Sequence, residues 1–397
     1  MTNRIGAWLI GARGSLATTT TIGLHALARG IATPVGLTTA TPAFASVPLA
    51  PFESIAIGGH DVVDISILEK AHGLAAGGMV PPALVSHLTD SLRESDRWIR
   101  RASNTGRTQQ DDIDAMASDI EAFASKLGLS TVVVVDVSST EPLPADQPAF
   151  HDEHLLRERL TTPGQRVLPP SSVAAAAAIQ AGAAYAGFTP SAGMSLPVLQ
   201  QRAADAAIPF AGQDGKTGET LLRTVLAPMF AARGLQVRSW AGANLLGGGD
   251  GATLADPEAV RSKLASKNRG LHALVGDDVI APLHIDNVPD LGDIKVAWDH
   301  VNATGFLGSP ITLQTTWSAY DSTLAAPLVI DLVRALALAS QAGQSGAIAE
   351  LGCFFKDPWG SDVHAFAEQT RLFQEWLERT GILVAARVDA EHASAAR

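Results

Sequence analysis

The chain contains a single cysteine, Cys353, among its 397 residues, so it can form no intramolecular disulfide. This is typical of a protein kept in a reducing compartment, and we expect a cytoplasmic protein. The chain also lacks a basic tract and has a formal net charge of −11. Nucleic acid and anionic membrane surfaces are therefore excluded as general partners, whereas a local basic pocket for a phosphorylated small molecule is not.

A credible membrane span is also missing. The apolar stretch 171–187 consists largely of alanine and has Gln180 in its middle, and the stretch 324–340 carries Asp331 and Arg334. We interpret both as buried or amphipathic helices. The short apolar run at the N-terminus leads into a glycine-rich turn without a cleavage site, which indicates a first strand and not a signal peptide.

The common motifs of metal and nucleophile chemistry do not occur. The sequence contains no CxxC, HExxH, Walker loop or nucleophile elbow. His151 and His154 have a spacing that metal ligands can have, but they lie in a polar, turn-like region, so we interpret them as solvent-exposed. No metal ligand is predicted from the residues.

What is present is the opening pattern of a doubly wound α/β unit. Residues 4–10 form an apolar run, followed by a glycine-rich turn, a predicted helix over 22–29 and a predicted second strand over 33–38. The β-branched run 131–137 is typical of a central parallel strand buried on both faces. Its carboxyl end, SSTEP, is where such sheets place ligand contacts, and 183–188 is predicted to be a further strand.

The character of the chain changes near residue 214 and returns to α/β near 322. The polar stretch 84–127 is predicted to be helical. The later elements are predicted to be a helix over 219–233, a strand over 235–240, a helix over 324–342 and a strand over 347–355. We therefore predict a Rossmann-type, doubly wound parallel sheet built from 1–213 and 322–397, with an α+β domain inserted over 214–321.

The first glycine-rich turn, Gly11 to Ala17, lies between the first strand and helix. Glycines there let backbone N–H groups approach a pyrophosphate at the helix N-terminus, although a tight turn without a ligand would look the same. An acidic residue is expected after the second strand to bind the ribose of NAD. Thr38, Thr39 and Ala40 stand there instead, and Asp61 is the nearest alternative.

Lysine is scarce and unevenly placed. Only seven of the 29 basic residues are lysines, and five of these lie between 216 and 356. An ammonium group can lose its proton when desolvated, and it can stabilise an enolate or oxyanion in a way that the always-charged guanidinium of arginine does not. The competing interpretation is a chance grouping of ordinary surface lysines.

Four of these lysines have informative surroundings. Lys263 and Lys267 are four residues apart, so on a helix both ammonium groups share one face, where they would bind a phosphate or simply be solvated. Lys295 is close in sequence to Asp293, a carboxylate that could set its pKa. Lys356 is predicted to end a buried strand, which is an unusual place for a surface lysine.

Taken together, these features make the chain resemble the inositol-1-phosphate synthase family, and most closely its archaeal-type branch. The similarity runs nearly end to end. It is carried by GARGSLATTTT (11–21), GGHD (58–61), SSTEPLP (138–144), FTPSAGMSLP (188–197), AGQDGKTGETLLRTVLAPMF (211–230), NLLGGGDG (244–251), RSKLASK (261–267), GDIK (292–295), GFLG (305–308), AAPLVIDL (325–332) and FFKDP (354–358).

The resemblance implies an NAD-dependent isomerase of the intramolecular lyase type. In that family NAD oxidises C5 of glucose 6-phosphate, a base forms the enolate at C6, C6 attacks the C1 aldehyde, and the ketone is reduced again to give an inositol phosphate. Family members are homotetramers, and their inserted domain carries the subunit contacts and the substrate pocket. A divalent or monovalent cation is a further requirement that the resemblance leaves open.

The family's functional residues can be transferred to matching positions. The implied catalytic residues are Lys263, Lys267, Lys295, Lys356 and Asp321. The implied substrate-binding residues are Asp214, Lys216, Asn244 and Asp293. The implied cofactor-binding residues are Gly11, Arg13, Gly14, Ser15, Leu16, Asp61, Ser139, Thr140 and Asp250.

Individual roles within the catalytic set are hypotheses. Lys267 and Lys356 would stabilise the C5 oxyanion or move its proton. Lys263 and Lys295 would polarise the C1 carbonyl or bind phosphate. Asp321 would orient a lysine, and together with Asp293 it could equally hold a cation.

Three positions depart from the family pattern. Gly248 replaces a polar residue before Asp250, Ile294 replaces a small polar residue in GDxK, and Ala40 replaces the acidic residue expected after the second strand. The first two remove hydrogen-bonding groups at or near the pocket, which changes discrimination among hydroxylated substrates. Two alternatives therefore stay open: a five-membered cyclitol phosphate synthase acting on fructose 6-phosphate, and a non-catalytic dinucleotide-binding regulatory protein.

Overall fold

A computed structural model of the chain describes residues 4–102, 106–247, 271–276 and 278–395. Its larger part is a seven-stranded sheet in the order β11-β6-β5-β4-β1-β2-β3, in which every paired strand is parallel. The strands are β1 (Ile5–Ile10), β2 (Ile55–Asp61), β3 (Ile99–Arg101), β4 (Thr131–Asp136), β5 (Ala184–Gly187), β6 (Pro209–Gly212) and β11 (Gly346–Ala347). The predicted doubly wound α/β class is confirmed.

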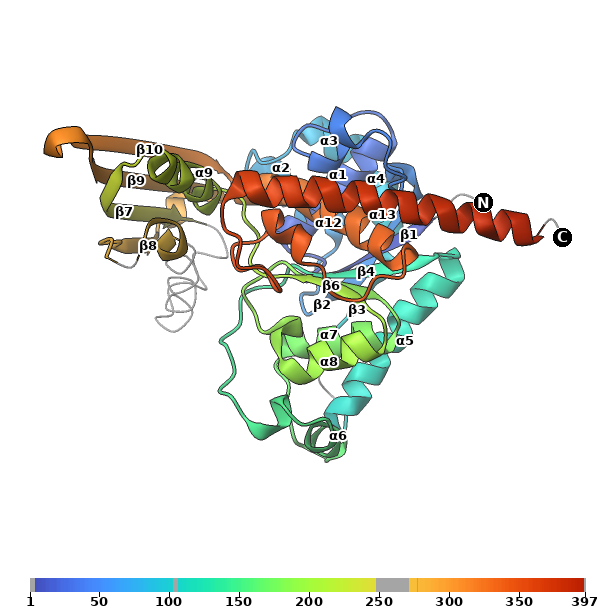
Figure 1. Cartoon of the computed structure of the whole chain (residues 1–397). Coiled ribbons are helices and arrows are strands. Elements are labelled where there is room, and N and C mark those ends of the chain that lie inside the picture. Colours follow the sequence, from blue (N-terminus) through green and yellow to red (C-terminus); the bar gives the residue numbers. More distant parts are fainter. Residues whose placement is uncertain (1–3, 103–105, 248–270, 277, 396–397) are drawn as a thin grey trace.

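Helices cover both faces of this sheet (Figure 1). One face carries α1 (Ser15–Ala28), α2 (Ile67–Ala76), α3 (Pro82–His87), α4 (Thr89–Asp96), α12 (Asp321–Gln341) and α13 (Phe366–Ala395). The other carries α5 (Gln109–Leu127), α6 (Glu153–Thr161), α7 (Pro170–Gln180) and α8 (Pro197–Asp205). Because both faces are covered, β4 is a continuous apolar run and not an alternating one.

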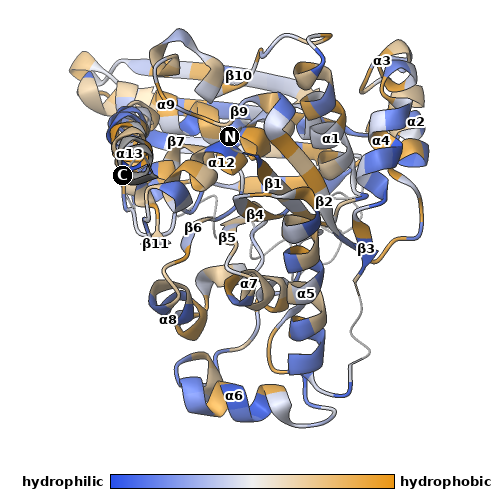
Figure 2. Cartoon of the chain, turned by 90° about the vertical axis from the view of Figure 1, so that its right-hand side faces the viewer, coloured by the Kyte–Doolittle hydropathy of each residue, from blue (hydrophilic) through white to orange (hydrophobic). Residues whose placement is uncertain are grey.

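Figure 2 shows the hydrophobic middle of the sheet and the more hydrophilic outer helices such as α6. Local signals explain where several helices begin and end. The longest helix on that side, α5, begins with a capping box between Thr108 and Asp111 and ends at Gly128 in the left-handed conformation.

The second sheet lies to one side of this body (Figure 1). It has four strands in the order β10-β9-β7-β8, namely β7 (Gln236–Leu246), β8 (Leu283–Asn287), β9 (Ile294–Thr304) and β10 (Pro310–Tyr320). The helix α9 (Glu219–Ala232) packs on one face, with Phe230, Trp240 and Val301 in the shared core. The domain limits at 213 and 322 stay a prediction.

Two predicted strands are wrong. Residues 33–38 form no strand; Pro34 and Gly36, with a φ of +92°, turn the chain, and a short 3-10 helix follows at Thr38–Ala40. The second strand of the sheet is instead β2. Of the predicted strand 347–355, Ala347 belongs to β11 and Phe355 forms an isolated bridge with Gly215, whereas Ala349–Phe354 form a 3-10 helix.

Among the described residues, α12 is the helix long and apolar enough to cross a membrane. Most of it is buried inside the protein, where it packs against α1, β4 and α13. Asp331 and Arg334 lie within its buried part. A helix enclosed on all sides by other elements is apolar all round for that reason, so α12 is a core helix, as predicted.

Candidate active site

The glycine-rich turn lies where the direction of strand addition reverses, between β1 and β4. Gly11 has a φ of +81°, and a Cβ there would lie 2.8 Å from Cα of Ser138 in the loop after β4. Glycine is required both by this conformation and by the close approach of the two loops. Doubly wound sheets bind dinucleotides at this reversal point.

The N-terminus of α1 is suited to a pyrophosphate. Its N-cap residue is Gly14, no side chain caps it, and no acidic residue lies in the first turn. The first backbone N–H groups of the helix, around Ser15 and Leu16, therefore combine with the helix dipole to attract an anion. These residues fit the predicted binding of NAD.

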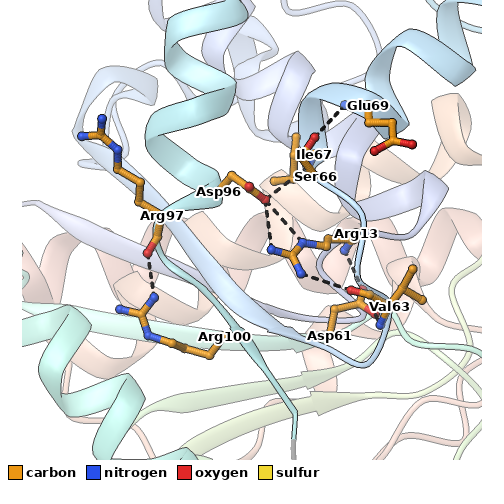
Figure 3. A network of polar contacts seen from close by, with 9 residues as sticks. All are labelled: Arg13, Asp61, Val63, Ser66, Ile67, Glu69, Asp96, Arg97 and Arg100. Atoms are coloured by element: carbon orange, nitrogen blue, oxygen red, sulfur yellow. Dashed lines mark hydrogen bonds and ion pairs between the residues drawn. The ribbon is translucent and has the colours of Figure 1, made fainter.

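Figure 3 shows how this turn is tied to β2. Asp61, the last residue of β2, accepts hydrogen bonds from the backbone N–H groups of Arg13 (2.7 Å) and Val63 (2.8 Å). The Arg13 guanidinium donates to Asp96 (3.3 Å from both Nε and Nη2) and to the Val63 carbonyl (3.1 Å). Arg13 thus fastens the turn to α4, and its side chain is engaged away from α1.

The position of Asp61 corrects one expectation. The acidic residue of a dinucleotide site follows the second strand of the sheet. That strand is β2, so the equivalent position is Asp61, and Ala40 lies in the 3-10 helix at Thr38–Ala40. Ala40 therefore does not occupy the acidic position of the dinucleotide site; that assignment assumed a strand at 33–38.

The loop after β4 carries Ser139 and Thr140, which are exposed and half-buried, respectively. It is anchored by Asp136, which accepts hydrogen bonds from the Ser138 hydroxyl (2.6 Å) and backbone N–H (3.0 Å). Burial raises the pKa of Asp136, and these hydrogen bonds oppose that rise. Glu141 accepts from the Ser171 hydroxyl and backbone, and burial raises its pKa as well.

The loop after β6 carries the next set of predicted residues. The Lys356 ammonium donates to Asp214 Oδ1 at 2.6 Å, and both side chains are buried. The two segments also pair through the backbone, from Lys356 N to the Asp214 carbonyl at 2.7 Å. Gly215 N donates to the Phe188 carbonyl after β5. Because all these strands are parallel, this loop lies at the same edge of the sheet as the glycine-rich turn.

Lys216 is only 3% exposed. Its ammonium donates to Gln369 Oε1 on α13 and lies 5.5 Å from the centre of the Phe366 ring. Burial is the main cause that lowers the pKa of Lys216 to about 8; Cys353 opposes this shift and the neighbouring Lys356 contributes to it. Lys216 is therefore a buried neighbour of Lys356 whose ammonium is bound to the neutral side chain of Gln369. Its contact with substrate stays a prediction.

The second sheet contributes the remaining described residues. Lys295, at the start of β9, lies 3.3 Å from Asp321 Oδ2 at the start of α12, and Thr217 donates to Asp321 Oδ1 at 2.7 Å. Asp321 is thus placed where it can orient a lysine. Asn244, on β7, is fully buried, and Asp293 lies half-buried in the turn before β9.

Some predicted residues lie outside the described part of the chain. These are Lys263, Lys267, Asp250 and the variant position Gly248. In the described part, no group of three or more His, Cys, Asp or Glu side chains could hold a metal ion. His151 and His154 are exposed, as predicted, and His151 bonds to Asp146 at 2.7 Å.

Sequence reasoning missed Thr217, Glu219 and Gln369, which bind Asp321, Asn244 and Lys216, respectively. The first two lie in the motif AGQDGKTGETL, and the concentration of polar residues in this motif is the local signal that indicates them. Gln369 lies 153 residues from its partner, and no local signal indicates it.

Comparison with known proteins agrees with this geometry. The family model described as myo-inositol-1-phosphate synthase matches residues 5–378. Inositol-3-phosphate synthase 1 of Bacteroides thetaiotaomicron is 29% identical over 415 residues, which cover 94% of each chain. Inositol-3-phosphate synthase of Drosophila melanogaster is 28% identical over 69% of this chain and 49% of its own length, so the match spans about half of that relative.

Two solved structures share the fold. Inositol-3-phosphate synthase of Caenorhabditis elegans superposes with a TM-score of 0.82 at 20% identity, covering 96% of this chain and 86% of that one. A myo-inositol-1-phosphate synthase-related protein of Thermotoga maritima gives a TM-score of 0.75 at 21% identity, covering 94% and 98%. Since the family model matches most of the chain, the protein belongs to the NAD-binding myo-inositol-1-phosphate synthase family.

Proposed function

We propose that this protein converts D-glucose 6-phosphate into 1D-myo-inositol 3-phosphate by an NAD-dependent intramolecular aldol cyclisation. The observation that carries the proposal is a set of two lysine–carboxylate pairs, Lys356–Asp214 and Lys295–Asp321, linked through the segment 214–217 at the sheet edge that also carries the dinucleotide-type glycine turn. One pair comes from the loop after β6 and the other from the second sheet and α12. The family and the Bacteroides relative agree with this chemistry.

The lysines suit the charges that the reaction develops. Enolate and alkoxide oxygens carry negative charge, and fixed ammonium groups in a site with little water stabilise such charge more than mobile water does. The side chains of Lys356 and Lys295 are 7% and 15% exposed, respectively, and each is oriented by a carboxylate. Lys356 would stabilise the C5 oxyanion or move its proton, and Lys295 would polarise C1 or bind phosphate.

When bound, NAD would supply reversible hydride transfer at C5, so the overall reaction has no net oxidation. The residues that would hold it are Gly11, Gly14, Ser15 and Leu16 at the pyrophosphate. Asp61 would support this site by holding the glycine-rich turn in place, since it accepts hydrogen bonds from the backbone N–H groups of Arg13 and Val63. Its position at the end of β2 also suits the adenosine ribose.

We further propose a cytoplasmic homotetramer. The single cysteine supports the compartment, and the family resemblance supports the assembly. The mass of the purified protein in solution, measured by light scattering, tests the tetramer. A cation requirement is tested separately by assaying the protein before and after treatment with EDTA.

The experiment that tests the activity incubates purified protein with NAD⁺ and either glucose 6-phosphate or fructose 6-phosphate, and follows the products by NMR. A six-membered inositol phosphate formed from glucose 6-phosphate is the expected result. A five-membered cyclitol phosphate from fructose 6-phosphate would replace the proposal with the second enzyme function. Copurified NAD without a product from either sugar would indicate the regulatory protein.

A further inference from the structure

The side-chain amide of Asn244 is buried, and only its NH₂ group has a hydrogen-bond partner among the described residues. The residue is fully buried on β7, and its Nδ2 donates to Glu219 Oε2 on α9 at 2.7 Å. Its Oδ1 is buried without a hydrogen-bond partner within the described part of the chain. A buried carbonyl oxygen that lacks a partner is rare in native proteins and points to a ligand that completes it.

The orientation of this amide follows from the chemistry of Glu219. An ionised carboxylate can only accept hydrogen bonds, so it selects the NH₂ end of Asn244 and turns Oδ1 away from α9. Glu219 is itself fixed, because Oε1 lies 2.5 Å from Nη2 of Arg223. The contact between Glu219 and Arg223 is an ion pair, and the hydrogen bond from Asn244 to Glu219 is charge-assisted, which makes it shorter and stronger than a bond between neutral groups.

Arg223 is fixed in turn by the second sheet. Its Nη2 and Nε donate to Asp299 Oδ1 at 2.8 and 3.1 Å, and Trp240 Nε1 donates to the same oxygen at 2.7 Å. Gly242 leaves room for the Arg223 guanidinium, since a Cβ at this position would lie 2.6 Å from Arg223 Nη2. A buried network between α9 and the second sheet is therefore formed by Glu219, Arg223, Trp240, Gly242 and Asp299.

The sheet register places Asn244 in the candidate active site. Asn244 is opposite Ala297, and Leu246, two residues along β7, is opposite Lys295. Lys295 is therefore the diagonal neighbour of Asn244 on the same face of the sheet. The ammonium of Lys295 reaches Asp321, so the amide lies beside the lysine–carboxylate pair.

We propose that Glu219 is a positioning residue that locks the Asn244 amide with Oδ1 toward the bound sugar phosphate, where it accepts a hydrogen bond from a substrate hydroxyl. The proposal rests on the proposed function for the identity of the sugar. It explains selectivity as well as binding. A buried acceptor that is left without its hydroxyl disfavours an analogue lacking that group far more than a missing methylene would.

The test compares glucose 6-phosphate with its 2-, 3- and 4-deoxy analogues. Affinities for NAD-loaded protein are measured by calorimetry, which needs no turnover. For wild type we expect one deoxy analogue to bind at least tenfold more weakly than glucose 6-phosphate. In Glu219→Gln the side chain can donate as well as accept, so the Asn244 amide can turn over. We expect that tenfold preference to fall to about twofold, with unchanged NAD affinity.

Two further variants keep the test decisive. Glu219→Asp retains the charge beside Arg223 but withdraws the carboxylate from Asn244, so this variant should also lose the preference among the analogues. It provides the test if Glu219→Gln does not fold. Thr224→Val is the control, because it changes a buried residue of the same helix whose hydroxyl bonds only to the Leu221 carbonyl among the described residues. It should keep the wild-type preference.

A folded Glu219 variant that keeps the full wild-type preference would overturn the positioning role, as would a wild type with no preference among the analogues. The proposed activity fails separately. If wild type forms no inositol phosphate but still binds glucose 6-phosphate with a preference that the Glu219 variants lose, the positioning role stands without the reaction.

Discussion

Replacing Lys216 by methionine tests what the buried ammonium of this residue contributes to stability. Methionine is of similar length and apolar, so Lys216→Met removes the ammonium while largely preserving the packing beside Phe366. Burial lowers the pKa of Lys216 from 10.5 to about 8. At about 1.4 kcal/mol per pKa unit, the folded state is destabilised at pH 7 by roughly 3 kcal/mol relative to a solvated lysine.

The substitution also removes favourable contacts. Gln369 Oε1 loses its buried donor, which costs about 1–3 kcal/mol. The contact with the Phe366 ring contributes about 0.5–2 kcal/mol. The loss of these two contacts nearly cancels the gain from removing the buried charge. We therefore expect the free energy of unfolding of Lys216→Met at pH 7 to lie within about 1 kcal/mol of wild type. Turnover should nevertheless fall, because Lys356 loses the neighbouring positive charge.

The pH dependence is the sharper measurement. Below pH 8 both the folded and the unfolded chain hold the Lys216 proton, so the full penalty applies. Between pH 8 and 10.5 the unfolded chain holds a proton that the folded chain has lost, so stability rises with pH. From pH 7 to pH 9.5, wild type should gain roughly 2 kcal/mol relative to Lys216→Met.

Urea unfolding followed by tryptophan fluorescence at pH 7, 8.3 and 9.5 provides these free energies. Lys126→Met is the control, because Lys126 is exposed on α5 and its loss should leave the pH dependence as in wild type. A difference between wild type and Lys216→Met that stays constant over this range would refute the reasoning. So would a variant that is several kcal/mol less stable at pH 7.

Three further changes test the site. Gly11→Ala should weaken NAD binding at least tenfold in a fluorescence titration, whereas Gly30→Ala, with a similar positive φ but open space around it, should not; equal effects would contradict the close approach of the two loops. Asp321→Asn should lower turnover about 10–100-fold at pH 7 with NAD affinity unchanged, because Lys295 loses its orienting charge; normal turnover would remove that role. Lys267→Ala should abolish turnover while NAD stays bound, and near-normal product formation would exclude Lys267 from catalysis.

Local sequence determined the elements whose environment is uniform along their length. The four valines Val132–Val135 of β4 are β-branched and apolar because both faces of the strand are buried, and the stretch 131–137 was predicted as a central strand for that reason. The helix at 219–233 was predicted within one residue of α9. The glycine turn was predicted because a positive φ and an uncapped helix N-terminus leave a local signature.

Distant contacts decided what local patterns could not. Residues 33–38 resemble a strand, but the backbone N–H groups of Thr38 and Thr39 donate to Asp331, almost 300 residues away. Asp331 is buried, so these bonds and the contact with Arg334 oppose the desolvation that raises its pKa to about 6. A pattern read over ten residues contains no information about such a partner.

The same division holds in the active site. The clustering of scarce lysines was enough to nominate Lys216, Lys295 and Lys356, because the chemistry of an ammonium belongs to the residue type, and the family resemblance added Asn244. Whether each group is bound to a carboxylate, a neutral amide or nothing depends on which distant segments fold against it. That pairing sets its orientation and its protonation, and only the tertiary structure decided it.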